Sequence, residues 1–287
     1  MRRVAAGAAD DGRLFGLGHP RDLCRFLHAG RVSFHRNMRT LAIANQKGGC
    51  GKTTTAVNLA TAFALGKRRV LLIDLDPQSH ATIGLGRDPE SLDRTVYDLF
   101  TDPTTSVSGL AVNSVIDGLR LLPSNILLSG VEFELASTEG REFVLASKLR
   151  EINGSYDICV IDCSPSLSLL TLNALVASNE VIIPVQTHYY ALEGLRQLLE
   201  TVDIVKRRFN EALEIRGILL TFVESRTKLS RQVQRQMREF FGDLVLDTVI
   251  HKDVRLAEAP SAHEPVFTYA PDSKGAAEHR ILAEEIS

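Results

Sequence analysis

Short runs of consecutive apolar residues recur along the chain from about residue 40, separated by longer amphipathic stretches. Apolar runs without alternation are typical of strands buried on both faces of a parallel sheet. The regular succession of such runs and helical stretches predicts an α/β fold, a single doubly wound, mostly parallel sheet flanked by helices. The expected strands are Leu41–Ala44, Val70–Ile73, Ile158–Ile161, Val181–Val185, Ile215–Val223 and Leu244–Ile250.

The stretches between these runs carry apolar residues three and four positions apart, the period of a helix that packs on one face. The first, Thr53–Leu65, has Ala56, Leu59 and Phe63 on that face. The remaining expected elements are an extended pair in Asn113–Leu122 and helices at Thr95–Phe100, Ile126–Ser137, Glu142–Ile152, Leu167–Ala177, Ala191–Phe209, Arg231–Phe241 and Lys274–Glu285.

Residues 1–37 differ from the rest of the chain in composition. They hold seven arginines, no lysine and three aspartates, with no sustained helical or strand period. We expect an N-terminal extension that is disordered or arises from an upstream start codon, with a basic arm that touches DNA or a membrane as the alternative. Residues 38–287 are expected to form one domain, because no linker or internal repeat interrupts them.

The 287-residue chain is 44% hydrophobic and 24% charged, as is ordinary for globular proteins. Its net charge of −2 excludes a general attraction to nucleic acid, so any such contact must come from a local patch. The four cysteines show no paired metal-ligand spacing, and no apolar stretch approaches the roughly 20 residues of a membrane span. We therefore expect a cytoplasmic protein without stable membrane association.

A glycine-rich loop between the first strand and the first helix has the composition of a phosphate-binding site. It comprises Lys47, Gly48, Gly49, Cys50, Gly51, Lys52, Thr53 and Thr54. The glycines let successive backbone N–H groups face an anion, and the following helix adds the positive end of its dipole. Lys52 is placed to contact the β- and γ-phosphates, and the Thr53 hydroxyl to bind Mg²⁺.

Two apolar runs end in aspartates that would lie at the same edge of the sheet as the loop. The second strand leads into Asp74 and Asp76, and a later strand leads into Asp162. The carboxyl ends of parallel strands meet at the crevice where open α/β sheets bind ligands. Because an aspartate after a buried strand holds Mg²⁺ or its waters in P-loop enzymes, Asp162 is a candidate metal residue.

The loop sequence Lys-Gly-Gly-Cys-Gly-Lys-Thr-Thr resembles the deviant Walker motif of the ParA/MinD group of ATPases. The resemblance implies that the site takes ATP with Mg²⁺. It also implies an ATP-dependent homodimer in which Lys47 reaches the partner's nucleotide, with Lys47 and Lys52 both acting in catalysis. Residues 74–78 match the group's D-x-D-P-Q segment, which assigns Asp76 to positioning the attacking water and to the metal shell.

Further segments resemble the chromosome-partition branch of this group, called Soj. The segments are Pro184–Gly194, Ser225–Ser230, Val254–Ser261 and Lys274–Ala276, so the resemblance covers about residues 38–285. The branch implies DNA binding without sequence preference, nucleoid association, and a ParB-type centromere-binding partner that stimulates hydrolysis during chromosome or plasmid segregation. Candidate DNA-binding residues are Arg226, Lys228, Lys252, Arg255 and Lys274.

Several positions depart from the family or the branch, among them Cys50, Ser164, His188, His251 and Asp253. Cys50 stands where valine is commoner, which indicates either a neutral change of size or a reactive thiol. His251 stands where the branch commonly has proline.

Three other functions remain as alternatives. A membrane-associated MinD-type ATPase would need a basic amphipathic C-terminal helix, whereas this chain ends in an acidic segment. An iron–sulfur reductase of the nitrogenase iron-protein kind would need well-separated cysteines at a dimer interface, and Cys159 and Cys163 are poorly spaced for that. A repressor would need an N-terminal winged helix, for which residues 1–37 are too few.

Overall fold

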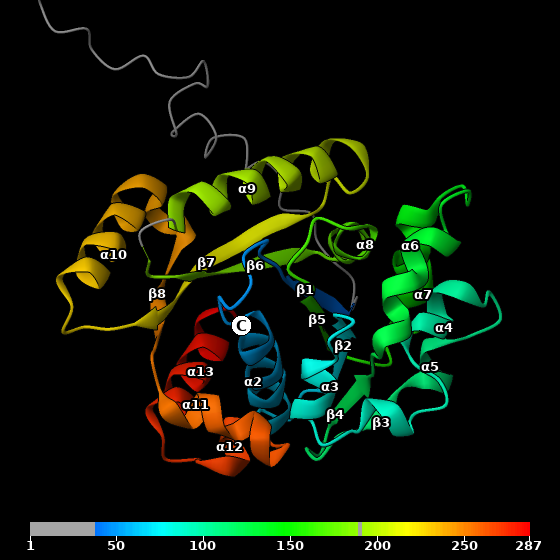
Figure 1. The fold of residues 1–287 in the computed structure, drawn as a ribbon, viewed down its shortest axis with the longest axis horizontal. Helices are drawn as coiled ribbons and strands as arrows, with labels where there is room; N and C mark the ends of the chain where they lie inside the picture. The colour runs from blue at the N-terminus through cyan, green and yellow to red at the C-terminus, as the bar shows by residue number, and fades with distance from the viewer. Residues whose placement is uncertain (1–37, 189–190) are drawn as a thin grey trace, which may run out of the picture. The chain divides into compact units, whose positions relative to one another are not determined.

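The computed structural model describes residues 38–188 and 191–287, in which eight strands form one sheet with helices on both faces (Figure 1). From edge to edge the strands are β3 (Val112–Asn113), β4 (Leu119–Leu122), β2 (Val70–Leu75), β5 (Ile158–Cys163), β1 (Arg39–Ile43), β6 (Glu180–Gln186), β7 (Glu214–Val223) and β8 (Val245–His251). Neighbouring strands are parallel except for β3 with β4. The predicted doubly wound, mostly parallel sheet is confirmed, and the expectation for residues 1–37 lies outside the described residues.

The central strands are apolar without alternation because both faces of the sheet are covered. Every residue of β2 and of β5 is buried. Since side chains alternate between the two faces of a strand, Leu71 and Ile73 join one core, while Val70 and Leu72 join the other.

Different sets of helices cover the two faces, as α9 above the sheet and α2 and α13 below it show in Figure 1. The first set is α4 (Val96–Thr101), α5 (Val107–Leu110), α6 (Val131–Glu134), α7 (Val144–Glu151), α8 (Leu169–Ala177), α9 (Ala191–Arg208) and α10 (Lys228–Phe241). The second set is α2 (Lys52–Leu65), α3 (His80–Gly84), α11 (Val254–Glu258), α12 (Val266–Tyr269) and α13 (Lys274–Glu285). Among the residues described, no helix combines the length and apolar character needed to cross a membrane.

Strand β1 marks the point where the winding of the sheet reverses. The chain leaves β1 through α2 and reaches β2 on one side, and later passes from β5 to β6 on the other side. Such a switch point opens a crevice at the carboxyl ends of the strands. The pairing register brings Ile43 at the end of β1, and Asp74 on β2, beside Asp162 on β5.

Most of the predicted strands and longer helices are confirmed, with ends displaced by at most three residues. The predicted helix Ile126–Ser137 is wrong, because the segment forms a 3-10 turn at Ile126–Gly130 followed by the single helical turn α6. Gly130 stands at the junction, where it lowers helix stability. The predicted helix Glu142–Ile152 likewise begins with a 3-10 turn, Arg141–Phe143, before α7.

Candidate nucleotide-binding site

The loop between β1 and α2 exposes backbone amides at the switch point. Gly49 and Gly51 have φ values of +69° and +89°, a left-handed conformation that side chains other than glycine rarely adopt. No side chain of residues 38–188 or 191–287 caps the first turn of α2, so its N–H groups remain available to an anion. A Cβ atom at Gly48 or Gly49 would meet no described atom within 4 Å, which leaves space for phosphate oxygens.

The two lysines of the loop are held differently. The Lys52 side chain is buried, and its Nζ donates to the backbone oxygen of Lys47 at 3.1 Å. The backbone N–H of Lys47 donates to Asn45 Oδ1 at 3.0 Å, and Asn45 is anchored by a 2.6 Å bond to the Pro184 oxygen. The Lys47 ammonium has no hydrogen-bond or ion-pair partner in the described part of the chain. Lys52 therefore points across its own loop, while the charge of Lys47 is uncommitted.

The three predicted aspartates converge on the loop. Asp74 and Asp162 are fully buried and pair across β2 and β5, and Asp76 is buried just beyond β2. Asp74 accepts hydrogen bonds from both the N–H and the hydroxyl of Thr82, at 2.8 and 2.7 Å. Asp74 also accepts from the Asp76 N–H at 3.1 Å, so it orients the segment that carries Asp76.

Asp162 has an environment unlike that of the other two carboxylates. Both of its oxygens are buried without a hydrogen-bond partner among the described residues. Burial, and to a smaller extent the charge of Asp74, raise the pKa of Asp162 well above 3.8. The nearby Thr53 hydroxyl acts to lower this pKa, although no hydrogen bond of normal geometry joins Thr53 to Asp162. Burial also raises the pKa of Asp74 to about 6, against the hydrogen bonds from Thr82.

These residues fit Mg²⁺ with a nucleoside triphosphate. Buried, unpartnered carboxylate oxygens are the hard ligands that Mg²⁺ prefers, and the Thr53 hydroxyl beside them is another. When bound, Mg²⁺ neutralises charge on the phosphate oxygens. The chain itself contributes the amides and Lys52 on the phosphate side and the aspartates on the opposite side.

Several supporting contacts were not visible in the sequence. The Thr221 hydroxyl, near the end of β7, donates to the Cys50 oxygen at 2.8 Å and holds the loop from a distance of 171 residues. The next residue, Phe222, has a φ of +50°, an uncommon conformation for a bulky side chain. Ser124 donates to the Asp76 oxygen at 2.8 Å. No local pattern indicates such contacts, because each depends on how distant strands align.

The structure resolves the two readings of Cys50 in favour of an inert thiol. The side chain is fully buried and its Sγ donates to the Lys47 oxygen at 3.2 Å. Burial raises the pKa of the Cys50 thiol, despite the opposing effect of Lys52. A thiol that is neither exposed nor acidic is a poor nucleophile.

The five candidate DNA-binding residues are exposed and lie near the carboxyl ends of β7 and β8 or at the starts of nearby helices. The Lys252 N–H donates to the Val223 oxygen at 3.1 Å, which joins the two strand ends. Lys252, Arg255 and Lys274 line a common hollow. Helix α10 adds Arg231 and Arg235, which follow Lys228 on one helical face and were absent from the sequence prediction.

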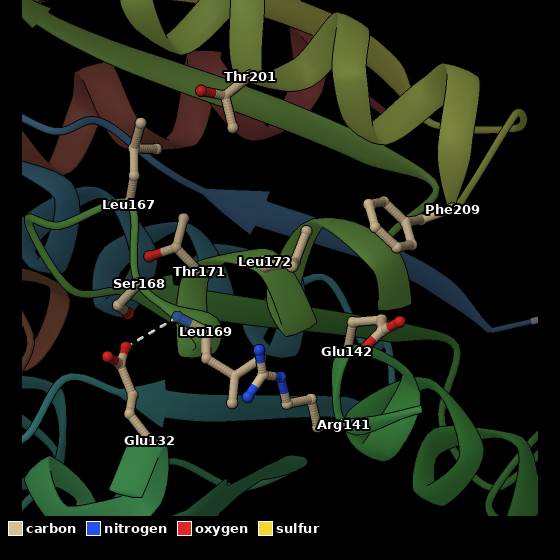
Figure 2. Close-up of a pocket in the computed structure, with 10 residues that line it drawn as sticks. All are labelled: Glu132, Arg141, Glu142, Leu167, Ser168, Leu169, Thr171, Leu172, Thr201 and Phe209. Carbon is tan, nitrogen blue, oxygen red and sulfur yellow. Dashed lines mark hydrogen bonds between the residues drawn. The ribbon is translucent and has the colours of Figure 1, made fainter. Parts of the chain in front are cut away.

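Figure 2 shows a separate pocket of about 550 Å³ beside α8 and α9. Its lining residues are Glu132, Arg141, Glu142, Leu167, Ser168, Leu169, Thr171, Leu172, Thr201 and Phe209. Glu132 accepts a hydrogen bond from the Leu169 N–H at 2.8 Å, the dashed line in the figure, and so satisfies the start of α8. None of the predicted site residues lines this pocket.

Comparison with known proteins gives one consistent result. Residues 38–215 match the model of a family described as an AAA domain. The chain is 46% identical over 249 residues to the sporulation initiation inhibitor protein Soj of Bacillus subtilis, covering 87% of this chain and 98% of that protein. It is 45% identical over 251 residues to the chromosome partitioning protein ParA of Caulobacter vibrioides, covering 87% and 94%.

A solved structure agrees with the geometry of the site. A cobyrinic acid a,c-diamide synthase from Mycobacterium smegmatis, with an ATP analogue and magnesium bound, is 38% identical with a TM-score of 0.76, covering 86% of this chain and 93% of that one. The glycine loop, the lysines and the buried aspartates described above thus occur in a fold that holds ATP and Mg²⁺. The chain belongs to the AAA-domain family of ParA/MinD-type P-loop proteins, with Soj and ParA chromosome-partitioning proteins among its homologues, and is an ATPase that uses ATP and Mg²⁺.

Proposed function

We propose that this ATPase dimerises when it binds ATP, binds DNA without sequence preference as a dimer, and returns to the monomer on hydrolysis. In this proposal a ParB-type partner stimulates hydrolysis, and the cycle segregates a chromosome or plasmid on the nucleoid. The observation that carries the proposal is the uncommitted ammonium of Lys47, whose backbone atoms are both fixed within its own loop. The Lys47 ammonium lies in the phosphate-binding loop but bonds to no described group of its own subunit. It can therefore contact the nucleotide of a second subunit.

The proposal assigns water positioning to Asp76. Its Oδ1 accepts from the Gln78 N–H at 3.0 Å, and its backbone is held by Asp74 and Ser124. One carboxylate oxygen is thus fixed by the protein chain, and Oδ2, which has no partner among the residues that the structure describes, can orient a water beside the γ-phosphate. Phosphoryl transfer depends chiefly on such positioning and on charge compensation.

DNA binding is proposed for the basic surface at the ends of β7 and β8. Arg226 and Lys228 form no ion pair with a described residue, whereas Lys252 pairs with Glu224, Arg255 with Glu258 and Lys274 with Glu278. Phosphate contacts do not depend on base sequence, so a patch of this kind supports non-specific binding. Dimerisation would double the patch, which couples DNA affinity to ATP.

No observation favours the membrane-associated alternative. Helix α13 packs against β8 and α2, and its apolar residues Ala276, Leu282 and Ala283 belong to the core. A helix whose apolar face is already buried cannot insert that face into a lipid surface.

Light scattering with and without Mg²⁺ and ATP tests the cycle. The unchanged protein should double in mass with ATP; Lys47→Ala should bind nucleotide and stay monomeric, and Lys52→Ala should lose nucleotide binding. Asp76→Ala should stay dimeric while hydrolysis falls at least about 100-fold, equivalent to about 2.7 kcal/mol in the barrier. Lys206→Ala, a lysine on α9, is the control. If Lys47→Ala dimerises as the unchanged protein does, Lys47 does not contact the nucleotide of the partner subunit.

A further inference from the structure

Three side chains outside the nucleotide loop form a hydrogen-bonded chain of nucleophile, base and acid. Ser225 lies in the turn after β7, His251 is the last residue of β8, and Glu278 lies on α13. Ser225 Oγ is 2.9 Å from His251 Nε2, and His251 Nδ1 is 2.5 Å from Glu278 Oε1. A serine within reach of a histidine that a carboxylate orients is the signature of an activated nucleophile.

The contacts of Glu278 determine the proton positions on the histidine ring. Glu278 also accepts the His251 backbone N–H at 2.8 Å through Oε2, so both carboxylate oxygens hold the same residue. Because an ionised carboxylate only accepts, Nδ1 of His251 carries the ring proton. Nε2 then presents its lone pair to the hydroxyl, and Ser225 donates to it.

The surroundings of Ser225 leave room for a substrate. Ser225 is exposed, and the backbone amides of Ser225 and Arg226 donate to no acceptor in the described part of the chain. Free amides at and just after a nucleophile can stabilise the oxyanion of an acyl-transfer intermediate. The hollow lined by Lys252, Arg255 and Lys274 borders the cluster, since Lys252 follows His251 and Lys274 lies 3.6 Å from Glu278.

We propose that Ser225, His251 and Glu278 form a second active site, which cleaves small carboxylic esters that carry an anionic group. The three lysine and arginine side chains of the hollow would bind the anion, while Asp253 in the same hollow is occupied by the N–H groups of Arg255 and Gly275, at 2.9 and 2.8 Å. None of Ser225, His251 and Glu278 belongs to the nucleotide site, whereas Lys252, Arg255 and Lys274 are shared with the DNA surface proposed above.

The reaction balances with water alone. Ser225 Oγ attacks the ester carbonyl carbon, and its proton passes to His251 Nε2. The bond from that carbon to the leaving oxygen breaks, and His251 returns the proton to the departing alcohol. A water molecule then attacks the acyl-serine, gives one proton to His251, and releases the carboxylic acid as Ser225 Oγ takes the proton back.

A serine-directed fluorophosphonate probe, with mass spectrometry of the labelled peptide, tests the nucleophile. We expect the label on Ser225, and its loss in both Ser225→Ala and His251→Gln. Ser108→Ala removes an exposed serine without a histidine partner and is the matched control, which should label as the unchanged protein does. Labelling that stays equal in Ser225→Ala overturns the proposal, as does the absence of any label on Ser225.

Hydrolysis of 4-nitrophenyl succinate, compared with the uncharged 4-nitrophenyl acetate, tests catalysis. General base catalysis contributes about 10²–10⁴-fold, so His251→Gln should lose at least about 100-fold in kcat/KM. Ser225→Ala, which removes the nucleophile itself, should lose at least as much, and more for the anionic ester. Thermal melting of Ser225→Ala should match the unchanged protein, since the side chain is exposed. Equal rates in the two proteins would contradict the site.

Glu278 is a positioning residue, and its test is the separation of kcat from KM. Glu278→Gln can no longer accept hydrogen bonds from His251 through two carboxylate oxygens, so kcat should fall while KM for 4-nitrophenyl succinate stays unchanged. A purely structural role for Glu278 would change KM and the melting temperature together with kcat, and an unchanged kcat would contradict its part in the site.

Discussion

Single residues of the nucleotide site hold conformations and charges that are unfavourable in the free protein. Asp162 is fully buried with both oxygens unpartnered, and Phe222 has a left-handed backbone beside Gly51. A buried, unsatisfied polar group costs about 1–3 kcal/mol, and more when charged. Asp162 and Phe222 therefore lower the stability of the ligand-free protein, as is common where a binding site is adapted to its ligand-bound state.

Replacing Asp162 tests this conflict directly. Asp162→Asn removes the buried charge, so the nucleotide-free protein should melt about 2–4 °C higher, as expected for roughly 1 kcal/mol in a domain of this size. In the unchanged protein, ATP should raise the melting temperature more when Mg²⁺ is present than when it is absent. Asp162→Asn should lose this additional increase. Thermal melts with and without Mg²⁺ and ATP measure both effects, and exposed Asp243→Asn is the control. A lower melting temperature without ligand would contradict the argument.

His279 gives the free energy of unfolding a defined dependence on pH. The side chain is fully buried, Nδ1 donates to the Gly275 oxygen at 2.8 Å, and Nε2 has no partner among the described residues. Burial lowers its pKa from 6.5, so below about pH 6.5 the unfolded chain binds a proton that the folded chain does not. The contribution of His279 is thus complete above that pH and is lost as the pH falls.

Urea unfolding at pH 7.5 and pH 5.5 measures this contribution. Between pH 7.5 and pH 5.5, the free energy of unfolding should fall less in His279→Phe than in the unchanged protein. The difference should be up to about 1.4 kcal/mol for each unit by which burial lowers the pKa of His279 within this range. Exposed His80→Asn should leave the difference unchanged. If His279→Phe and His80→Asn behave alike, the buried histidine is not the cause.

Among the elements, long periodic segments were predictable and short ones were not. Helix α13 and strands β2 and β5 follow from apolar runs or a clear period. Helices α3, α5, α11 and α12 have only four or five residues, so about one turn is available to show a period of 3.6. Their positions depend on tertiary contacts, such as the packing of α11 and α12 against each other and α12 against α2.

The same distinction applies to the nucleotide site. The loop, Asp74, Asp76 and Asp162 could be predicted because each is encoded by a local strand-to-loop pattern. The bond from Thr221 to the loop and the Ser225–His251–Glu278 chain could not, since they join residues separated by 26 to 171 positions. Contacts at such separations depend on sheet register, which no local pattern specifies.

The packing of α13 on α11 depends on a residue without a side chain. A Cβ atom at Gly275 would lie 2.6 to 3.0 Å from three carbon atoms of Leu256, closer than real Cβ contacts. Gly275→Ala should therefore lower the free energy of unfolding by about 1–3 kcal/mol through overpacking. Leu256→Ala should restore part of that loss in the double variant, because it removes the clashing atoms.

A double-mutant cycle by urea unfolding measures the coupling between these two positions. Gly130→Ala, whose added Cβ would approach only the flexible end of Glu134 at 4.0 Å, is the matched control. Additive effects of Gly275→Ala and Leu256→Ala would contradict the packing argument.

At the scale of the whole molecule, the nucleotide loop and the basic surface are joined through β7. Thr221 near the end of this strand holds the loop at Cys50, while Arg226 and Lys228 follow directly in the turn and at the start of α10. Ser230 of α10 also donates to the Thr187 hydroxyl at 3.1 Å. A short, hydrogen-bonded segment therefore connects the ATP site to the proposed DNA surface, which suits a protein whose DNA affinity changes with nucleotide.

The basic surface leads to a prediction that ranks its members. A phosphate contact releases counterions, so each lost contact should reduce the slope of log affinity against log salt by roughly 1. Arg226 and Lys228 form no ion pair with any described residue, so their positive charge is available to phosphate, whereas Lys252, Arg255 and Lys274 share theirs with a glutamate. We therefore expect Arg226→Ala and Lys228→Ala to weaken binding of ATP-bound protein more than the other three single variants.

Titration of random-sequence duplex DNA at several salt concentrations, with ATP or ADP, measures these slopes. The unchanged protein should bind more tightly with ATP, and the variant with all five residues changed to alanine should lose most of its salt dependence while still dimerising in light scattering. Lys206→Ala on α9 controls for the loss of one positive charge elsewhere on the molecule. Equal DNA affinity in ATP and ADP would contradict the coupling of DNA binding to nucleotide. If the variant with all five residues changed binds DNA as the unchanged protein does, the DNA surface lies elsewhere. A reversed ranking, with Lys252→Ala or Arg255→Ala the more damaging, would show instead that DNA displaces the glutamates from their ion pairs.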